Sequence, residues 1–501
     1  MVTKIIQNKK KILRPLIFVL LNLFVFSQEI NPQLPSVEPL FLAQDIGIEA
    51  DNTGPVLSAD DVFKLSLRFS ECVYDSQEWA FCVEQFESLK KKVSSQDFMN
   101  LEQAERGRAI LKLIYQDYLK TYNFNQTKIN VALQEGVYNC VSSALLYMAV
   151  AKAAGLDVRG QKTSEHAFCT VYIPGSKAGQ VQKIDVETTN PYGFNPGSKE
   201  AIENEDKIQG YYIVPKKYYS NRQEVSDRIF TGLIAQNICA AYILQDDYEK
   251  AVPLGAARYE LVRLEQSKSV SQVRRDFDVI ASNYVNVECE SAQAFLPILD
   301  WFTLFIDRWK MTDYLQKNMD NAFNNLMVYC FNEKNYELAA EAYEKDKVYL
   351  TKNQDAKTAD LLTDILVTSK ISDEPAETQI AVIEQLLNET EFEPDQEKRV
   401  LIYLENAWLS ILNTCMTERT YGTGYQKACD ALERLPDSTK IKKMQKSFYD
   451  NCIAIIHNNF AKQANAGYFD DARKILEAGM QVFPDDKTLK NDLVTLERMM
   501  K

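Results

Sequence analysis

Histidine, glycine and proline are all scarce in this chain. Its 501 residues include only two histidines, 17 glycines and 15 prolines. So few glycines and prolines indicate long helices and few turns. Two histidines, and the lack of any two cysteines separated by two residues, argue against a zinc site. We therefore expect neither a metal ion nor a cofactor. The ten cysteines are too few to form a disulfide framework in a chain of this length.

Positive charge is also in deficit. Lysine and arginine together number 57, against 70 aspartates and glutamates, which gives a formal net charge of -13. An acidic surface repels the phosphate backbone of nucleic acids. The composition therefore predicts that no nucleic acid is a partner.

The N-terminus has the proportions of a secretory signal peptide. A basic stretch, MVTKIIQNKKKILR, precedes an apolar run over 16–26, and Val25 and Ser27 suit the positions that a signal peptidase reads. The run is shorter than the about 20 apolar residues that span a bilayer. We predict a signal peptide over 1–27, export to the periplasm or the extracellular space, and no membrane span after cleavage. An uncleaved segment would instead anchor the chain to a membrane. Prolines and glycines over 28–57 predict an extended linker.

A cysteine at the start of a helix is the first sign of a reactive site. Cys140 directly precedes an alanine-rich run over 141–154, and Gly155 follows the run as a glycine C-cap does. The sulfur therefore falls at the helix N-terminus. There the positive end of the helix dipole favours the thiolate, which is the reactive form of the side chain.

A histidine and two acids follow on a predicted hairpin. His166 opens a strand that ends at Ile173, and a second strand covers 181–188. Asp185 and Glu187 are two residues apart on this second strand and therefore share a face. Cys140 could then act as the nucleophile, with His166 as the base and one acid fixing the imidazole tautomer.

The other histidine, His457, carries no such signal. It lies in an apolar helical run with no acid nearby in the sequence. We interpret it as a structural residue.

The spacing of these residues resembles that of the transglutaminase-like superfamily, whose members are circularly related to papain. Gly136, Cys140 and His166 match the family pattern, and the resemblance covers residues 100–215. The closing acid-Pro-Thr motif of the family is replaced by VETT. Alignment on its threonine puts the acid at Glu187, with Asp185 as the alternative. The resemblance implies an α+β transglutaminase-like (papain-like) domain, predicted over 58–220, with the Cys-His-Glu/Asp triad of a cysteine peptidase or amidase.

A short motif recurs in the second half of the chain. It consists of an aromatic residue, two polar residues and an alanine, and such a motif is typical of the second helix of a tetratricopeptide repeat. The four copies span Tyr248–Ala251, Tyr336–Ala339, Tyr425–Ala428 and Phe469–Ala472. Their spacings of 88, 89 and 44 residues depart from the regular repeat of about 34. We predict that 221–501 is an all-α, tetratricopeptide-like solenoid with insertions, and that its first helix begins at Asn221.

Two functions fit these features. One is an exported cysteine hydrolase or acyl-transfer protein that acts on peptide or amide bonds, with helical repeats that bind a protein or peptide as substrate or partner. The other is an exported scaffold for protein–protein interaction, in which the transglutaminase-like domain is not catalytic. The reactivity of Cys140 separates the two. The sequence carries no sign of the oligomeric state.

Overall fold

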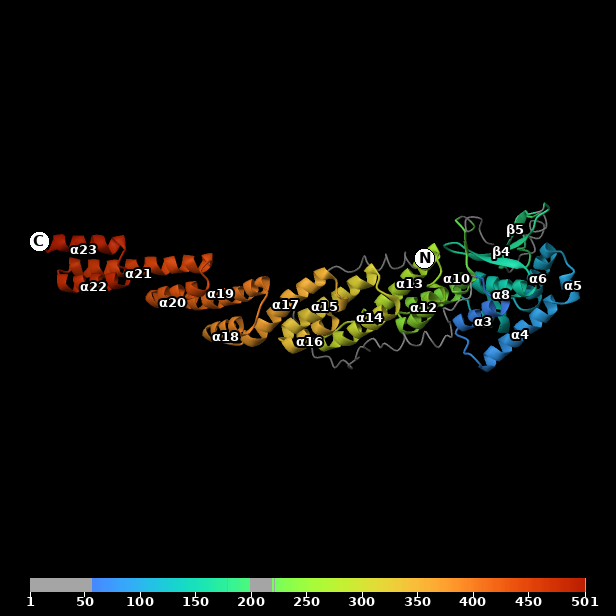
Figure 1. Ribbon diagram of the computed structural model, residues 1–501, viewed down its shortest axis with the longest axis horizontal. Helices are drawn as coiled ribbons and strands as arrows, with labels where there is room; N and C mark the ends of the chain where they lie inside the picture. The colour runs from blue at the N-terminus through green and yellow to red at the C-terminus, as the bar shows by residue number, and fades with distance from the viewer. Residues whose placement is uncertain (1–55, 178, 199–218, 220, 501) are drawn as a thin grey trace. The chain divides into compact units, whose positions relative to one another are not determined.

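The computed structural model describes residues 56–177, 179–198, 219 and 221–500. This part of the protein is mostly helical and contains one small antiparallel sheet of four strands (Figure 1). The predicted signal peptide over 1–27 lies outside the described residues, as does all but the end of the predicted linker over 28–57. Within the described ranges, none of the helices combines the length and the apolar character that crossing a membrane requires.

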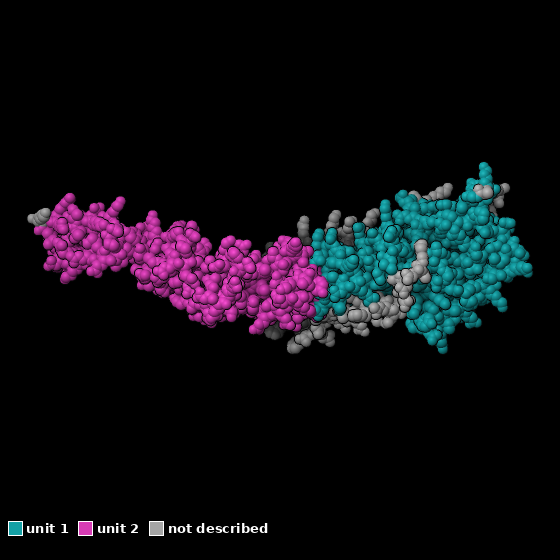
Figure 2. Space-filling model, viewed as in Figure 1, with its two compact units in different colours: residues 1–288, 300–318 teal, residues 289–299, 319–501 magenta. Residues whose placement is uncertain are grey.

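The chain forms two compact units (Figure 2). The first comprises residues 1–288 and 300–318, and the second comprises 289–299 and 319–501. The helices of the first unit are α3 (Ala59–Phe69), α4 (Gln77–Val93), α5 (Gln96–Met99), α6 (Gln103–Asp117), α7 (Ile129–Gln134), α8 (Cys140–Ala153), α10 (Asp227–Thr231), α11 (Leu233–Leu244), α12 (Tyr248–Val262) and α13 (Lys268–Tyr284). Helices α14 (Leu296–Trp309) and α15 (Asp313–Glu333) contribute to both units.

Helix α8 is the central helix of the first unit. All residues from Val141 to Ala151 are buried, because α3, α4, α6 and α7 pack around the helix and two strands cover it. A helix that is buried on every side needs small and apolar side chains all round, in place of a single apolar stripe. This requirement explains the alanine-rich run. The predicted helix is confirmed, and Gly155 beyond its end has a φ of 75°, a conformation that glycine adopts at little cost.

The sheet has the strand order β5-β4-β3-β6. Its strands are β3 (Asp157–Lys162), β4 (Ala167–Pro174), β5 (Val181–Val186) and β6 (Gln223–Val225), and a separate parallel pair consists of β1 (Thr121–Tyr122) and β2 (Val137–Tyr138). The hairpin of β4 and β5 is confirmed, but the ends of its strands differ from the prediction: His166 lies just before β4, and Glu187 lies just after β5. The prediction of a helix that begins at Asn221 is wrong, because β6 lies there and pairs with β3. Without β6, the backbone N–H and C=O groups along that edge of β3 would lack partners.

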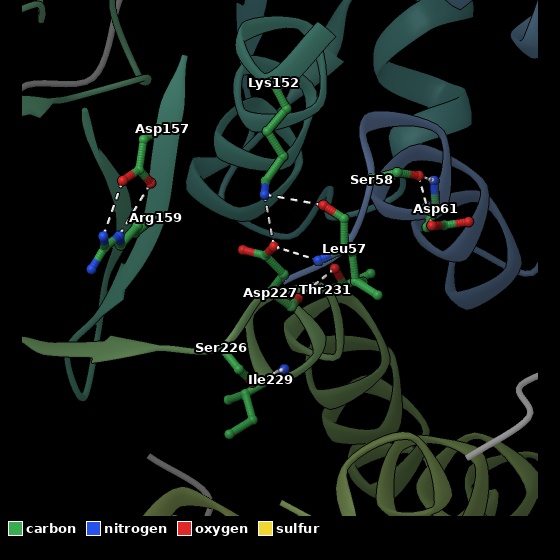
Figure 3. A network of polar contacts seen from close by, with 10 residues as sticks. All are labelled: Leu57, Ser58, Asp61, Lys152, Asp157, Arg159, Ser226, Asp227, Ile229 and Thr231. Atoms are coloured by element: carbon green, nitrogen blue, oxygen red, sulfur yellow. Dashed lines mark hydrogen bonds and ion pairs between the residues drawn. The ribbon is translucent and has the colours of Figure 1, made fainter. Parts of the chain in front are cut away.

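A buried ion pair joins the end of α8 to the start of α10 (Figure 3). The Nζ atom of Lys152 lies 2.8 Å from Oδ2 of Asp227 and also donates a hydrogen bond to the C=O of Leu57 at 3.1 Å. The same oxygen of Asp227 accepts the N–H of Leu57 at 2.8 Å. The two charged side chains are only 11% and 7% exposed. A buried pair is tolerated when both charges have further hydrogen-bond partners, and Leu57 supplies them here.

Every described residue of the second unit that lies in a regular element is helical. Besides its parts of α14 and α15, the unit contains η3 (Ala292–Phe295), α16 (Tyr336–Asp346), η4 (Lys347–Tyr349), α17 (Lys352–Ile371), α18 (Ala376–Glu389), α19 (Pro394–Thr417), α20 (Tyr421–Arg434), α21 (Thr439–Asn465), α22 (Phe469–Val482) and α23 (Lys487–Met499). Successive helices such as α18 and α19, α20 and α21, and α21 and α22 pack against each other. Because only a few residues connect them, the two helices of each pair run in opposite directions.

The alanines of the recurring motif are all buried. Ala251, Ala339, Ala428 and Ala472 have no exposed surface. Three copies of the motif begin a helix as predicted, at the first residues of α12, α16 and α22. The copy at 425–428 does not, because α20 already begins at Tyr421.

The early start of α20 places a glycine at the contact with the next helix. A Cβ atom on Gly424 would lie within 2.7 Å of three ring atoms of Phe448 in α21. The two helices therefore approach each other more closely than any side chain would allow. Tyr421 and Gly424 take the places that the aromatic residue and the alanine hold in the other copies, which explains the shift by one helical turn.

The burial of the motif alanine leads to a stability prediction. Ala472 lies in the core between α21, α22 and α23, so Ala472→Trp should lower the free energy of unfolding by about 1–3 kcal/mol through overpacking. Ala478→Trp is the matched control, because Ala478 is exposed on the same helix. Urea denaturation of both variants measures the difference. Equal stabilities would contradict close packing at residue 472.

Candidate active site

Cys140 is the first residue of α8, and the capping of this helix leaves its backbone N–H unused. The N-cap residue Asn139 accepts hydrogen bonds on Oδ1 from the N–H groups of Val141 and Ser142, at 2.9 and 3.1 Å. In return, the N–H of Asn139 donates to the hydroxyl of Ser142 at 3.0 Å. Among the described residues, the N–H of Cys140 has no acceptor. A half-buried thiol and a free backbone donor thus lie side by side at the positive end of the helix.

His166 is held by the turn between β3 and β4. Its N–H donates to the hydroxyl of Thr163 at 3.0 Å, and its C=O accepts the N–H of Thr163 at 2.8 Å. The imidazole stacks on Phe168 with the ring centroids 5.9 Å apart. The side chain is only 2% exposed. The backbone and the ring are therefore both fixed before any substrate arrives.

Glu187 is the acid that bonds to this histidine. Its Oε2 atom lies 2.7 Å from Nε2 of His166, and its side chain is as deeply buried as the imidazole. The other carboxylate oxygen, Oε1, accepts the N–H and the hydroxyl of Thr189, at 3.1 and 2.9 Å. Both oxygens of the carboxylate thus have partners.

The loop that carries Glu187 is hydrogen-bonded to α6, β2 and α8. The C=O of Thr188 accepts the hydroxyl of Tyr115 at 2.7 Å, and the C=O of Thr189 accepts the hydroxyl of Tyr138 at 3.1 Å. The side-chain hydroxyls of Thr188 and Ser143 are 3.0 Å apart. Because Ser143 belongs to α8, the loop with the acid and the helix with the cysteine are in direct contact.

A glycine lies directly against the backbone of Glu187. The N–H of Glu187 donates to the C=O of Gly193 at 2.8 Å. A Cβ atom on Gly193 would lie 2.8 Å from the carbonyl carbon of Glu187, 2.9 Å from its Cβ, and closer still to its carbonyl oxygen. No other residue type fits there without moving the loop.

Asp185 has different partners, for a reason that the register of the hairpin supplies. Residue 185 lies opposite Thr170, whose hydroxyl donates to Oδ1 of the aspartate at 2.9 Å. The other carboxylate oxygen forms an ion pair with Arg222. Thr170 is four residues beyond His166, whereas the same register extended by two residues brings Glu187 opposite Phe168. The register therefore brings Glu187, and not Asp185, close to the imidazole.

These neighbours change the protonation of His166. Burial by itself would lower the pKa, because it penalises the charged imidazole. The hydrogen bonds to Cys140 and Glu187, and the negative charge of both groups, outweigh burial and raise the pKa of His166 to about 10. The imidazole is therefore protonated at neutral pH. Because Nε2 is bonded to Glu187, Nδ1 is the nitrogen that remains for the interaction with Cys140.

Most other cysteines are in surroundings that keep the proton on the sulfur. Burial raises the pKa of Cys72 to about 11 and the pKa values of Cys82 and Cys239 to about 12. Cys289 and Cys429 resemble Cys140 in being half-buried, and neither is the first residue of a helix. They are the natural internal comparison for the reactivity of Cys140.

His457 bonds to an acid that is distant in the sequence. Its Nδ1 atom lies 2.7 Å from Oδ2 of Asp492, which is 35 residues further along the chain and belongs to α23. The imidazole joins α21 to α23, and its side chain is half-exposed. Within the described ranges, no three histidine, cysteine or acidic side chains converge as the ligands of a metal ion would.

Sequence reasoning missed three residues at the site. Thr189 and Gly193 position Glu187, and the hydroxyl of Tyr219 donates to Oε2 of Glu187 at 2.6 Å. The N–H and the hydroxyl of Thr189 both donate to the acid two residues earlier, and both residues belong to the VETT sequence. Tyr219 is more than 30 residues away from Glu187 and has no such local signal.

The comparisons with known proteins give little further information. No family model matches the sequence. No curated protein sequence matches it either. Among solved structures, the chain is similar to menin, whose crystal structure is described as revealing the binding site for the Mixed Lineage Leukemia (MLL) protein. The alignment covers 76% of this chain and 84% of the menin chain, with 10% sequence identity and a TM-score of 0.29. A similarity this distant says nothing about activity.

Proposed function

We propose that this protein is an exported cysteine hydrolase or acyl-transfer enzyme that acts on peptide or amide bonds. The observation that carries the proposal is the surroundings of one imidazole. His166 bonds to the carboxylate of Glu187, the thiol of Cys140 interacts with the same imidazole and raises its pKa, and the imidazole and the carboxylate are buried. Along the chain, the cysteine lies at the start of a helix, the histidine just before a strand and the acid just after a strand. This order supports a transglutaminase-like, papain-like arrangement for the first unit.

The first chemical step is attack by sulfur. In the reactive pair the proton of the Cys140 thiol already resides on His166 as an imidazolium, and the thiolate attacks the carbonyl carbon of an amide. The carbonyl oxygen becomes an oxyanion beside the sulfur. The unused N–H of Cys140 is the donor within reach of this oxygen, and the start of α8 adds the positive end of its dipole.

The second step is departure of the amine. The imidazolium of His166 returns its proton to the leaving nitrogen, the C–N bond breaks, and the acyl group remains on Cys140 as a thioester. Glu187 keeps the ring oriented and stabilises its positive charge throughout. Water then releases the acyl group as an acid, or an amine takes it in a transamidation. In either reaction His166 takes a proton from the attacking water or amine, the C–S bond breaks, and the sulfur of Cys140 leaves as the thiolate of the original ion pair.

The second unit supports a role in binding. Pairs of antiparallel helices stacked one after another form an extended surface with many equivalent positions, which suits an extended peptide or a protein partner. We therefore assign recognition of the substrate or of a partner protein to tetratricopeptide-like helix pairs. The basic and apolar segments at the N-terminus support export, with the site then acting in the periplasm or outside the cell.

Selective alkylation tests the proposal. The full chain is treated with a limiting amount of iodoacetamide at pH 7, and each cysteine is quantified by peptide mass spectrometry. We expect Cys140 to be labelled at least about tenfold faster than Cys289 and Cys429, because a helix start and an imidazolium both favour its thiolate. His166→Ala should remove most of this advantage.

The scaffold alternative gives the opposite result. If the three half-buried cysteines react at equal rates, and His166→Ala changes none of them, the site holds no activated thiol. The helical repeats would then carry the function, as an exported scaffold for protein–protein interaction.

A further inference from the structure

We propose that Tyr219 is a positioning residue of the site, which shares Oε2 of Glu187 with His166 and so limits how strongly the carboxylate holds the imidazolium; this inference rests on the proposed function. The hydroxyl of Tyr219 and Nε2 of His166 bond to the same oxygen, Oε2 of Glu187, at 2.6 and 2.7 Å. Thr189 occupies the other oxygen with two hydrogen bonds. A carboxylate with four hydrogen bonds on its two oxygens cannot rotate without breaking at least two of them.

The ring of Tyr219 also forms part of the wall around the imidazole. Its edge faces the ring of His166 at a centroid distance of 6.0 Å and an angle of 78°, and it faces Phe168 at 5.1 Å and 67°. Burial, together with the charge of Glu187, raises the pKa of Tyr219. The hydroxyl therefore keeps its proton and acts as a hydrogen-bond donor over the whole range in which the site could work.

Asp185, the second acid of the hairpin, pairs with a residue that is close to Tyr219 in the sequence. Arg222, three residues after Tyr219, forms the ion pair with Asp185, and its guanidinium lies 5.8 Å from the ring centroid of Phe168. The two acids of the hairpin thus have separate partners: Glu187 bonds to His166 and Tyr219, and Asp185 bonds to Thr170 and Arg222.

Sharing one oxygen between two donors has a consequence that can be measured. The charged or titratable groups that face His166 are Cys140 from α8, Glu187 from the end of β5, and Tyr219, with the Asp185–Arg222 pair further along the hairpin. A hydroxyl that donates to Oε2 draws negative charge away from the imidazolium on the same oxygen. Removing the hydroxyl should therefore raise the pKa of His166 further, because an accepting carboxylate with fewer donors stabilises the remaining positive charge more strongly.

The scarcity of histidine makes this pKa accessible. Selective ¹³C labelling of histidine in the full chain gives only two ring signals, and His457→Gln identifies the signal of His166 by elimination. The two-histidine count of the chain is what makes this assignment possible. We expect Tyr219→Phe to move the titration midpoint of His166 upward by about half a unit to one unit, with no loss of the ring packing.

A matched control is available on the same sheet. Tyr172 also donates its hydroxyl to a carboxylate, that of Glu224, but it makes no bond to the site. Tyr172→Phe should leave the His166 midpoint unchanged, and melting curves of both tyrosine variants confirm that the fold is retained. Glu187→Gln should lower the midpoint, because it removes the negative charge itself.

The outcomes distinguish the positioning role from the function on which it rests. If Glu187→Gln lowers the midpoint and Tyr219→Phe leaves it in place, or moves it no more than Tyr172→Phe does, the tyrosine only fills space and the inference is overturned while the active site stands. If neither Glu187→Gln nor Tyr219→Phe changes the midpoint, the His166–Glu187 pair itself does not exist in solution, and the proposed function fails with it.

Discussion

Glu187→Gln is expected to slow acylation of Cys140 by on the order of 10⁴-fold, the scale of loss when the acid of such a triad is replaced by its amide. Glutamine has nearly the same shape, but every hydrogen bond of Glu187 is an accepted one. Its NH₂ group must therefore face either the two donors of Thr189 or the donors of His166 and Tyr219. Either choice leaves buried donors without an acceptor and removes the charge that stabilises the imidazolium.

Asp185→Asn is the matched comparison for this variant. It is the same chemical change two residues earlier, near the end of β5, but Asp185 and Arg222 are both partly exposed. An ion pair of that kind contributes at most about 1 kcal/mol, so we expect less than a tenfold change. Release of p-nitrophenol from p-nitrophenyl acetate measures acylation of the thiolate without knowledge of the natural substrate. Equal losses in the two variants would show that the acids are not divided as the geometry indicates.

Gly193→Ala should be one of the most disruptive single substitutions in the first unit. The added methyl group would overlap the carbonyl group of Glu187, and backbone atoms cannot move aside as the end of a flexible side chain can. Overpacking of this kind costs about 1–3 kcal/mol, and more where rigid backbone is involved. The loop can relieve the overlap only by breaking the hydrogen bond between Glu187 and Gly193. We therefore expect a loss of about 3 kcal/mol or more in the free energy of unfolding, together with slower alkylation of Cys140.

Gly422→Ala provides the control for this prediction. A Cβ atom on Gly422 would meet no neighbour within 4 Å, and the residue lies in the first turn of α20. Alanine should be neutral or stabilising there by up to about 1 kcal/mol, because it favours the helix. Urea denaturation with fluorescence detection reports both variants. If Gly193→Ala proved as harmless as Gly422→Ala, the close approach of residue 193 to the backbone of Glu187 would not exist.

Elements that depend on residues close together in the sequence could be predicted, and elements that depend on distant residues could not. Helix α8 and the hairpin of β4 and β5 have local signals: an alanine-rich run with a glycine after it, and β-branched residues on both sides of a turn. Strand β6 has no such signal. It pairs with β3 across more than 60 residues of chain, and three residues that favour a helix start in isolation form a strand because the edge of β3 needs partners.

The same limit applies within the site. The cysteine, the histidine and the two acids are recognisable from their types and order, but the choice between Asp185 and Glu187 depends on the hairpin register, which the sequence alone specifies weakly. Tyr219 and the partner of His457 depend on tertiary packing alone. In the helical half, the aromatic residue and the alanine predict three helix starts. The motif fails at α20, where Gly424 replaces the alanine one turn earlier.

The buried pair of Lys152 and Asp227 determines how this protein can be divided. A fragment that ended at residue 220 would retain Cys140, His166 and Glu187, yet it would lack β6 and Asp227. Lys152 would then lose its counter-charge, and the parts of α3 and β3 that α10 contacts would be uncovered. The bare edge of β3 would be open to pairing with other molecules. We therefore expect the smallest fragment that folds alone with Cys140, His166 and Glu187 in place to extend past α10. A chain cut just before β6 should aggregate.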